Sequence, residues 1–181
     1  MESTEQNEVA ASATQYEYLG KKFKVPPVHL ALVHLNKPID IAHIAQIALA
    51  TDHIVTHQIG STLDFGFQKV AAKVASWNIK RSDIDSLSRR ETTLDDLKEE
   101  GFRLVGTAPE ATQSALDFEW QDNDVIVIGG ANGLSERDMS KMDEMIGIPT
   151  SDKISFLTVT PVVSILVYDI LDQRGLWASE S

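Results

Sequence analysis

D-V-I-V-I-G-G-A-N-G-L-S, residues 124–135, decides how this chain folds. Asp124–Ile128 is an apolar, β-branched run that predicts a buried strand. The glycine-rich turn Gly129–Gly133 follows at once, and Ser135 is a good cap for a helix after it. A strand ending in such a turn can bring backbone N–H groups close to a ligand beyond the carboxyl edge of an α/β sheet. The turn matches no phosphate-binding motif, so an ordinary tight turn explains it equally well.

The same alternation of strand and helix runs along the rest of the chain. Strands are predicted at Val28–His34, Ile54–Ile59 and Phe102–Thr107. Helices are predicted at Ile41–Thr51 after an Asp40 cap, at Leu63–Ser76, from Thr93 to Gly101, from Ser135 to Met145 and at Val159–Leu171. Trp77–Thr92 is polar and fits neither pattern. This order predicts an α/β fold with a mostly parallel sheet and helices on both faces.

Length and composition favour one domain. The chain has 181 residues and no cysteine, which excludes disulfides and thiolate metal sites. Residues 1–19 lack apolar periodicity and are interpreted as a disordered acidic tail, so the domain is expected at residues 20–181. No apolar run reaches the length of a bilayer span, and the polar start lacks the features of a signal peptide. A cytoplasmic location is therefore expected.

Charge is distributed unevenly along the chain. The net charge is −11, yet residues 1–90 carry 10 Lys and Arg against 9 Asp and Glu, and residues 91–181 carry 6 against 18. Phosphate contacts dominate nucleic-acid affinity, so any RNA surface is expected in the first half. The candidate residues are Lys69, Lys73, Lys80, Arg81, Arg89 and Arg90. A solvated face of mixed charge is the competing interpretation.

All five histidines lie between positions 29 and 57. Because side chains alternate along a strand, His29 and His34 should point to opposite faces of the sheet. His53 and His57 should share a face but stand ~13 Å apart, too far for one ion. No metal site is expected.

The C-terminal 50 residues resemble a known family of RNA-modifying enzymes. The strand, the glycine turn, an Ile-Pro pair and a β-branched stretch opening the last helix occur in the order found in the SpoU (TrmH-like) RNA 2′-O-methyltransferases of the SPOUT superfamily. The matching positions are Ile128, Gly129, Gly133, Leu134, Ile148, Pro149, Leu157, Val159 and Tyr168. Upstream, Pro38–Gln46 occupies the place of the family motif N-P-x-N-x-G-x-I-x-R.

The resemblance implies a fold, a cofactor and a reaction. Family members thread their C-terminal segment through a loop to form a trefoil knot, and they bind S-adenosylmethionine largely through backbone groups. The implied cofactor-binding positions are Thr107, Gly129, Gly130, Ile148, Phe156 and Leu157. The family dimerises through the last helix and methylates a ribose 2′-hydroxyl of tRNA or rRNA, so the implied partners are RNA and a second copy, with no DNA and no membrane.

Several polar positions of the family motifs are substituted. Gln46 stands in place of the motif arginine, and Asp40 and Ala42 replace its asparagine and glycine. The family's G-S-E turn reads Gly129–Ala131, and Phe156, Thr158 and Thr160 replace the polar residues of its S-L-N-V-S stretch. The residues expected at the catalytic site are Gln46, His43 and Asp40, although helix capping alone would explain Asp40.

Two other functions stay open at this point. One is a catalytically inactive, knotted homodimer that binds RNA or the cofactor. The other is an unrelated small α/β nucleotide-binding enzyme that shares only the strand–turn–helix pattern. An apolar stripe along the last helix, made of Val163, Leu166, Val167 and Ile170, is expected to pack in the core or form a homodimer face.

Overall fold

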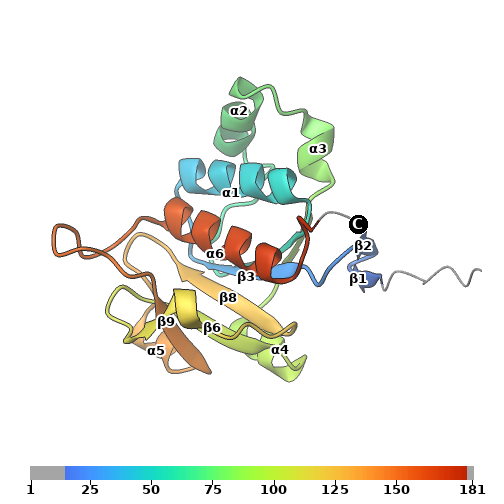
Figure 1. Ribbon diagram of the computed structural model, residues 1–181. Coiled ribbons are helices and arrows are strands. Elements are labelled where there is room, and N and C mark those ends of the chain that lie inside the picture. The colour runs from blue at the N-terminus through green and yellow to red at the C-terminus, as the bar shows by residue number, and fades with distance from the viewer. Residues whose placement is uncertain (1–14, 179–181) are drawn as a thin grey trace, which may run out of the picture.

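The computed structural model describes residues 15–178, and its centre is a seven-stranded sheet (Figure 1). The strand order is β5-β4-β3-β8-β6-β9-β7, and every neighbouring pair is parallel. The strands are β3 (Val28–Val33), β4 (Ile54–Ile59), β5 (Ser88–Glu91), β6 (Arg103–Thr107), β7 (Gln113–Ser114), β8 (Asp124–Gly129) and β9 (Glu144–Gly147). The predicted α/β class with a parallel sheet is confirmed.

Helices cover both faces of this sheet, as expected. α1 and α6 lie against one face with α2 and α3 beyond α1, whereas α4 and α5 lie on the other side (Figure 1). The helices are α1 (Pro38–Thr51), α2 (Gln68–Ser76), α3 (Arg81–Asp85), α4 (Leu94–Glu99), α5 (Glu136–Met139) and α6 (Val159–Gln173), with a 3-10 turn η1 (Ala115–Asp117). None of the helices described within residues 15–178 is long and apolar enough to span a membrane.

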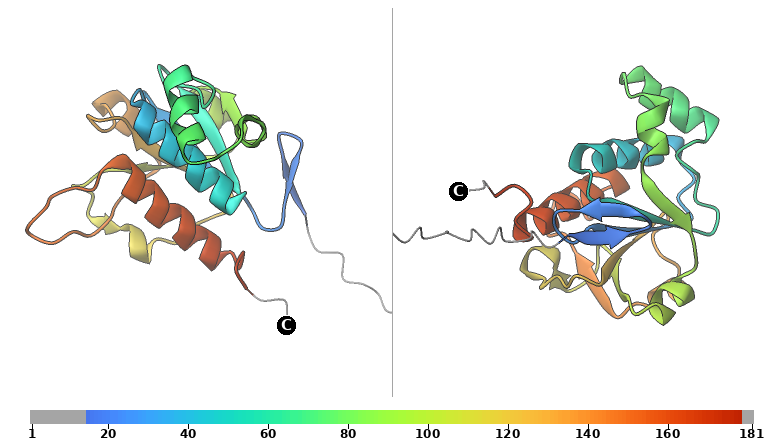
Figure 2. Two further views of the ribbon diagram at one scale, coloured as in Figure 1. Left: turned by 90° about the horizontal axis from the view of Figure 1, so that it is seen from above. Right: turned by 90° about the vertical axis from the view of Figure 1, so that its right-hand side faces the viewer.

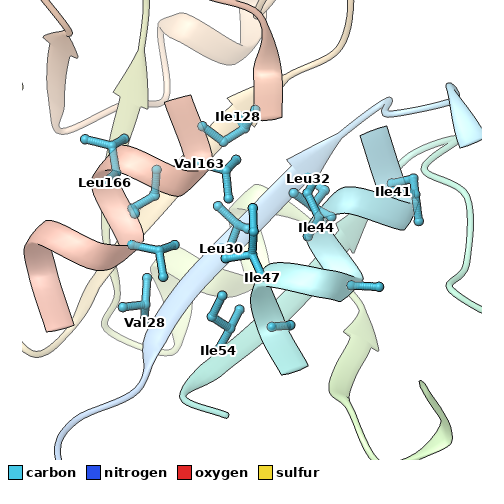
Figure 3. Packing of buried hydrophobic residues seen from close by; sticks show 14 of the residues in the cluster. Val28, Leu30, Leu32, Ile41, Ile44, Ile47, Ile54, Ile128, Val163 and Leu166 are labelled. Carbon is cyan, nitrogen blue, oxygen red and sulfur yellow. The ribbon is translucent and has the colours of Figure 1, made fainter. Parts of the chain in front are cut away.

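The core follows from the alternation of side chains along the central strands. Leu30 and Leu32 of β3 face α1 and α6, where Ile44 and Val163 meet them (Figure 3). Ala31 and its neighbours on the other face pack toward α4. Both faces of β3, β4 and β8 are buried, which explains the nearly continuous apolar runs of β3 and β8. β4 instead buries three polar side chains, Thr56, His57 and Gln58. The stripe of Val163, Leu166, Val167 and Ile170 is buried in this core, so it packs within the chain.

A short antiparallel hairpin precedes the sheet. β1 (Tyr16–Tyr18) pairs with β2 (Lys21–Phe23), and the hairpin stands beside the amino ends of the central strands (Figure 2). Tyr18 packs its ring edge against His29 at a centroid distance of 4.7 Å. The expected disordered tail ran to residue 19; residues 1–14 lie outside the described residues, but residues 16–18 form a strand, because aromatic burial orders them.

Two helix starts differ from the predictions, and one unassigned stretch contains regular structure. α1 begins at Pro38, so Lys37 is the N-cap and Asp40 lies in the first turn; the expected Asp40 cap is wrong because proline suits the first helical position. α2 begins at Gln68, five residues later than the predicted Leu63. The polar stretch Trp77–Thr92 holds α3 and the edge strand β5.

The helix predicted from Ser135 to Met145 is also wrong in its second half. Ser135 does cap α5, accepting a hydrogen bond from the Asp138 amide at 3.1 Å. The helix ends at Met139, and Glu144–Gly147 forms β9. β9 lies between β6 and the two-residue β7 and is only half-buried, so it lacks the apolar run that marks a central strand.

Candidate functional site

A cavity of about 650 Å³ opens at the carboxyl edge of the sheet. It lies where β6, β8 and β9 end and where the loop before α6 returns, and we call it the carboxyl-edge cavity. Its floor is apolar, with Ile128, Ile146 and Leu166 buried beneath it. Three charged side chains reach its lining, Lys37, Asp40 and Glu110. A largely apolar cleft with few polar groups is typical of a small-molecule site.

The turn Gly129–Gly133 forms one wall of this cavity, and its glycines are required by close backbone contacts. A Cβ at Gly129 would overlap the backbone of Gly133, and a Cβ at Gly130 would stand 2.7 Å from the carbonyl oxygen of His34. Gly133 has a φ of +70°, in the left-handed region that favours glycine. The Gly130 amide donates to the Val33 carbonyl at 3.1 Å, which ties the turn to the end of β3.

The six positions expected to bind the cofactor all line this one cavity. They come from four separate segments of the chain, which the parallel sheet brings together at its carboxyl edge: Thr107, Gly129, Gly130, Ile148, Phe156 and Leu157. Phe156 is 53 % exposed, so its ring stands at the open side. The hydroxyl of Thr107 donates to the Val127 carbonyl at 3.2 Å.

Sequence reasoning missed other lining residues. Gly147 must be a glycine because a Cβ there would lie 2.8 Å from the carbonyl oxygen of Ala108. Glu110 and Lys37 bring charge to the cavity from loops, and Lys37 directly precedes the motif segment Pro38–Gln46. Glu110 lies between β6 and β7, whereas Lys37 follows β3, and the parallel order of the strands brings both to the carboxyl edge of the sheet.

The three residues expected at the catalytic site are not brought together within one chain. Asp40 lines the carboxyl-edge cavity. His43 does not line it, and its ring packs against Trp77 at a centroid distance of 4.9 Å. Gln46, one turn further along α1, is exposed and also lies outside the lining.

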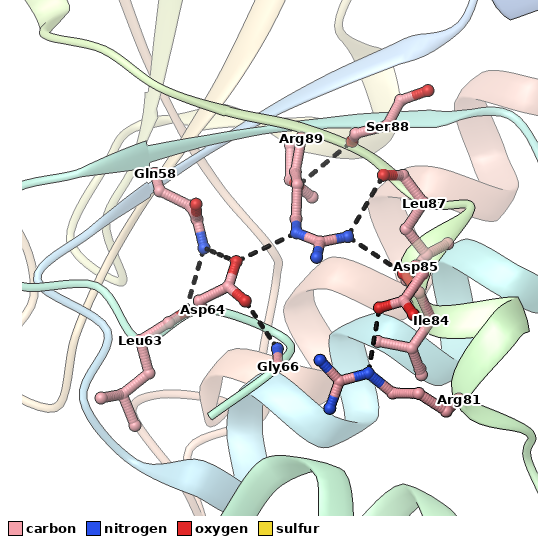
Figure 4. A network of polar contacts seen from close by, with 11 residues as sticks. Gln58, Leu63, Asp64, Gly66, Arg81, Ile84, Asp85, Leu87, Ser88 and Arg89 are labelled. Atoms are coloured by element: carbon pink, nitrogen blue, oxygen red, sulfur yellow. Dashed lines mark hydrogen bonds and ion pairs between the residues drawn. The ribbon is translucent and has the colours of Figure 1, made fainter. Parts of the chain in front are cut away.

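The six basic residues expected to bind RNA divide into two groups. Arg89 pairs with Asp64 at 3.0 Å and Arg81 with Asp85 at 3.0 Å (Figure 4), and Arg90 pairs with Glu100 at 2.6 Å. The three lysines, Lys69, Lys73 and Lys80, are exposed on and after α2. The Lys73 ammonium lies 5.3 Å from the centre of the Trp77 ring.

The carboxylate of Asp64 organises the loop after β4 around Arg89 (Figure 4). It accepts hydrogen bonds from the Gly66 amide at 2.7 Å and from Arg89 at 3.0 Å. Burial by itself would raise the pKa of Asp64, but the Gly66 hydrogen bond and the Arg89 guanidinium lower it below its ordinary value. Arg89 therefore serves this loop and is not free for RNA.

A buried histidine pair lies on the α4 face of the sheet. His29 and His57 approach within 3.0 Å through Nδ1 and Nε2, and Arg90 Nε donates to His57 Nδ1 at 3.1 Å. Burial lowers the pKa of His29 to about 4 and, together with the neighbouring His29, the pKa of His57 to about 3. His34 lies beyond the end of β3 with a φ of +53°. It lines a shallow pocket with Leu94 and Ser135 on the α4 side of the sheet, which is also the side of His29, so the expected opposite orientation is wrong because the strand ends before His34.

His53 is buried at the start of β4, separate from this pair. It accepts a hydrogen bond from the Lys24 amide at 3.2 Å. The pairing of His29 with His57 was not predicted, because it depends on the register of β3 against β4, in which Ala31 stands opposite His57.

Comparisons with known proteins all point to one family. A sequence profile of the SpoU rRNA Methylase family matches residues 27–168. The 23S rRNA (guanosine-2′-O-)-methyltransferase RlmB of Yersinia pestis is 28 % identical over 110 residues, covering 60 % of this chain and 45 % of that protein. The RlmB of Pseudomonas syringae is 29 % identical, covering 83 % of this chain and 60 % of the relative. The chain thus spans about half the length of these two relatives.

Solved structures agree with the fold. The SpoU methyltransferase AviRb from Streptomyces viridochromogenes superposes with a TM-score of 0.70 at 19 % identity, covering 83 % of this chain and 60 % of AviRb. A second structure, AviRb in complex with the cofactor AdoMet, gives a TM-score of 0.67 at 18 % identity, covering 83 % of this chain and 58 % of that chain. Because the profile extends over residues 27–168, an unrelated enzyme sharing only a strand–turn–helix pattern is ruled out.

Proposed function

This chain belongs to the SpoU rRNA Methylase family, and we propose that it transfers a methyl group from S-adenosylmethionine to a ribose 2′-hydroxyl of tRNA or rRNA. One observation carries the proposal: six positions implied by the resemblance, from four separate segments, line a single cavity of about 650 Å³. S-Adenosylmethionine supplies an electrophilic methyl group on a sulfonium. The relatives named RlmB are 23S rRNA guanosine-2′-O-methyltransferases, which favours a ribose acceptor.

The cavity suits this cofactor in shape and chemistry. The floor of Ile128 and Ile146 offers an apolar surface for an adenine ring, and Phe156 can cover it from the open side. The Gly129–Gly133 turn presents backbone with no side chains in the way. Thr107, Ile148 and Leu157 complete the proposed cofactor contacts. Backbone recognition explains how the pocket tolerates the substitutions that surround it.

Within one chain, Asp40 is the proposed proton acceptor. As the ribose oxygen bonds to the methyl carbon and the carbon–sulfur bond breaks, the hydroxyl proton must go to a base. Asp40 lines the cavity, and its carboxylate forms no hydrogen bond or ion pair among residues 15–178. Asp40→Asn should lower kcat about 100-fold while the affinity for S-adenosylmethionine changes little.

A homodimer would give Gln46 and His43 a role. On α6, Ile165 and Tyr168 are 37 % and 44 % exposed, and the Tyr168 ring stacks on Trp177 at 5.8 Å. An apolar patch of this kind on a helix suits a two-fold interface. α1 lies beside α6 (Figure 3), so a partner's α1 could bring Gln46 and His43 to the neighbouring site.

We also propose the knot. The segment 150–158 projects beyond the sheet before the chain returns as α6 (Figure 2). In the proposed topology this segment passes through a loop beside the Gly129–Gly133 turn. The likeness to AviRb supports the fold that such a knot requires. Residues 20–181 are proposed to act as one knotted domain in the cytoplasm, together with the strand β1 that packs against it.

The exposed lysines form the proposed RNA surface. Lys69, Lys73 and Lys80 stand on and after α2 beside the ring of Trp77, a mixture of cations and an aromatic that suits RNA. Arg81, Arg89 and Arg90 would contribute only by exchanging their carboxylate partners for phosphates.

A second function is favoured by one observation. Gln46 replaces the motif arginine, and a glutamine carries no charge and cannot act as a base. The alternative is a homodimer that binds RNA or the cofactor without transferring methyl. Gln46→Arg would then give activity to an inactive protein, whereas an active enzyme would gain little from the same change.

Two measurements test the proposal. Calorimetry with S-adenosylmethionine should show binding at one site per chain. If no binding is detected, the cavity neither serves methyl transfer nor binds the cofactor. Incubation of the protein with S-adenosylmethionine and either total tRNA or fragmented rRNA, followed by nucleoside analysis, should then yield a 2′-O-methylnucleoside. Cofactor binding without any such product would favour the non-catalytic alternative.

A further inference from the structure

Lys37 stands at the rim of the carboxyl-edge cavity. Of the side chains that line this cavity, it is the single cation, and the carboxylates of Asp40 and Glu110 line the same cavity. Its ammonium group makes no hydrogen bond or ion pair with any residue between 15 and 178. The side chain is exposed, in contrast to the buried floor, so it meets what approaches the cavity from solvent.

Lys37 is a poor residue for the position that it occupies in the fold. It is the N-cap of the 14-residue helix α1, and its side chain forms no capping hydrogen bond. Ser, Thr, Asp or Asn would satisfy a free amide there, and a cation opposes the positive end of the helix dipole. A residue that is unfavourable for its place in a helix, and that forms no compensating contact, is typical of a functional position.

We propose that Lys37 is a positioning residue that binds a backbone phosphate of the RNA and thereby holds the acceptor ribose at the cavity mouth; this inference rests on the proposed function. The observations favour phosphate over the cofactor's carboxylate. A ligand seated on the floor is enclosed by apolar residues and the glycine turn, whereas RNA is too large to enter and must rest on the rim. Lys37 is a rim residue.

Electrostatics makes this contact necessary. Asp40 and Glu110 give the lining a net negative charge, and the chain as a whole carries −11. A phosphate approaching such a rim is repelled unless a cation faces it. The arginines of the predicted RNA set are paired with carboxylates elsewhere, at Asp64, Asp85 and Glu100. Lys37 is thus the one cation of the lining that can receive the phosphate next to the methyl donor.

The test is Lys37→Ser, because function and stability should move in opposite directions. Serine is a better N-cap, so the melting temperature should rise or stay level. The affinity for total tRNA or fragmented rRNA should fall about tenfold, and the slope of log affinity against log salt should become shallower by about one unit. Lys37→Arg should keep the RNA affinity and the salt slope of the unchanged protein. Lys22→Ser, at an exposed lysine of the hairpin, is the matched control and should change neither.

The outcomes separate this proposal from the proposed function. RNA affinity and salt slope equal to those of the unchanged protein would overturn the role of Lys37, as would an unchanged protein that binds neither RNA pool. A loss of S-adenosylmethionine affinity in Lys37→Ser, with RNA affinity retained, would place the cation on the cofactor instead. Failure of the unchanged protein to bind S-adenosylmethionine contradicts the proposed function, and the RNA measurements still report on Lys37.

Discussion

At the scale of single residues, this site is built more from backbone than from side chains. Gly129 and Gly130 are held by contacts that leave no space for a Cβ, and Phe156 and Leu157 approach the same cavity from a distant segment. A pocket that binds through main-chain groups keeps its function while its polar side chains change. The six proposed cofactor positions line one cavity, whereas His43 and Gln46 of the proposed catalytic residues lie outside it.

Gly130→Ala should damage both the fold and the cavity. The new Cβ would stand 2.7 Å from the carbonyl oxygen of His34, a backbone atom that cannot rotate away. We expect a loss of about 1–3 kcal/mol in the free energy of unfolding and weaker binding of S-adenosylmethionine. Gly66→Ala is the comparison, since its Cβ would meet the exposed side chains of Asp64 and Arg81 and no backbone atom, and it should cost less stability. Urea denaturation and calorimetry check both effects; equal stability of the two variants would contradict the steric argument.

The buried histidine pair should make stability depend on pH. The pKa values of His29 and His57 are lowered to about 4 and about 3, so both rings are neutral in the folded protein. The unfolded chain binds protons near pH 6.5, and it therefore holds more protons than the folded chain between about pH 6.5 and pH 4. The free energy of unfolding should be highest above pH 6.5 and fall as the pH drops through this window.

Urea denaturation at pH 7.5 and pH 5 measures this effect. His57→Gln removes one titrating ring and keeps a group that can accept from Arg90, so its stability should change less between the two pH values. His34→Gln, at an exposed histidine, should behave like the unchanged protein. If His57→Gln loses as much stability on acidification as the unchanged protein, the pair is not the source of the pH dependence.

At the scale of elements, the central strands could be predicted and the edges could not. β3 and β8 are buried on both faces, so their apolar runs mark their bounds within one residue. The bounds of β4 are marked by Ile54 and Ile59 on either side of three buried polar residues. β5 and β9 are half-buried, and their sequences Ser-Arg-Arg-Glu and Glu-Met-Ile-Gly carry no period of their own. Their place depends on pairing with distant strands, and pairing is not visible in a single sequence.

α4 shows that a local capping signal can be sufficient. The hydroxyl of Thr93 accepts a hydrogen bond from the Asp96 amide at 3.1 Å, as its position before the helix predicts. Thr93→Ala should lower the free energy of unfolding by about 1 kcal/mol. Thr92→Ala, one residue earlier and without a side-chain hydrogen bond in the described chain, should have a smaller effect. Thermal or urea unfolding of the two variants checks this. An equal loss in the free energy of unfolding would mean that the loss of a hydroxyl, and not the cap, is responsible.

At the scale of the whole molecule, the distribution of catalytic candidates favours a shared site. Asp40 lines the cavity of its own chain, whereas Gln46 lies on the same helix but outside that lining. If the proposed dimer forms through α6, Gln46 of each chain serves its partner's cavity. The side chain of Tyr168 on α6 is 44 % exposed, so Tyr168→Asp would place a charge in the proposed interface. Light scattering should then show a monomer in place of a dimer. Leu116→Asp, at an exposed apolar residue outside α6, should leave the dimer intact.

Mixing two inactive variants gives the sharpest test of such a shared site. Asp40→Asn and Gln46→Ala should each lose methyl transfer as homodimers. After the two are unfolded and refolded together, half of the dimers would be mixed, and each mixed dimer would hold one cavity with both residues intact. Methylation of total tRNA or fragmented rRNA should therefore recover to about a quarter of the activity of the unchanged protein. Without recovery, and with mixed dimers confirmed by mass spectrometry, Asp40 and Gln46 would have to act within one chain, and the proposed transfer of Gln46 across the interface would be wrong.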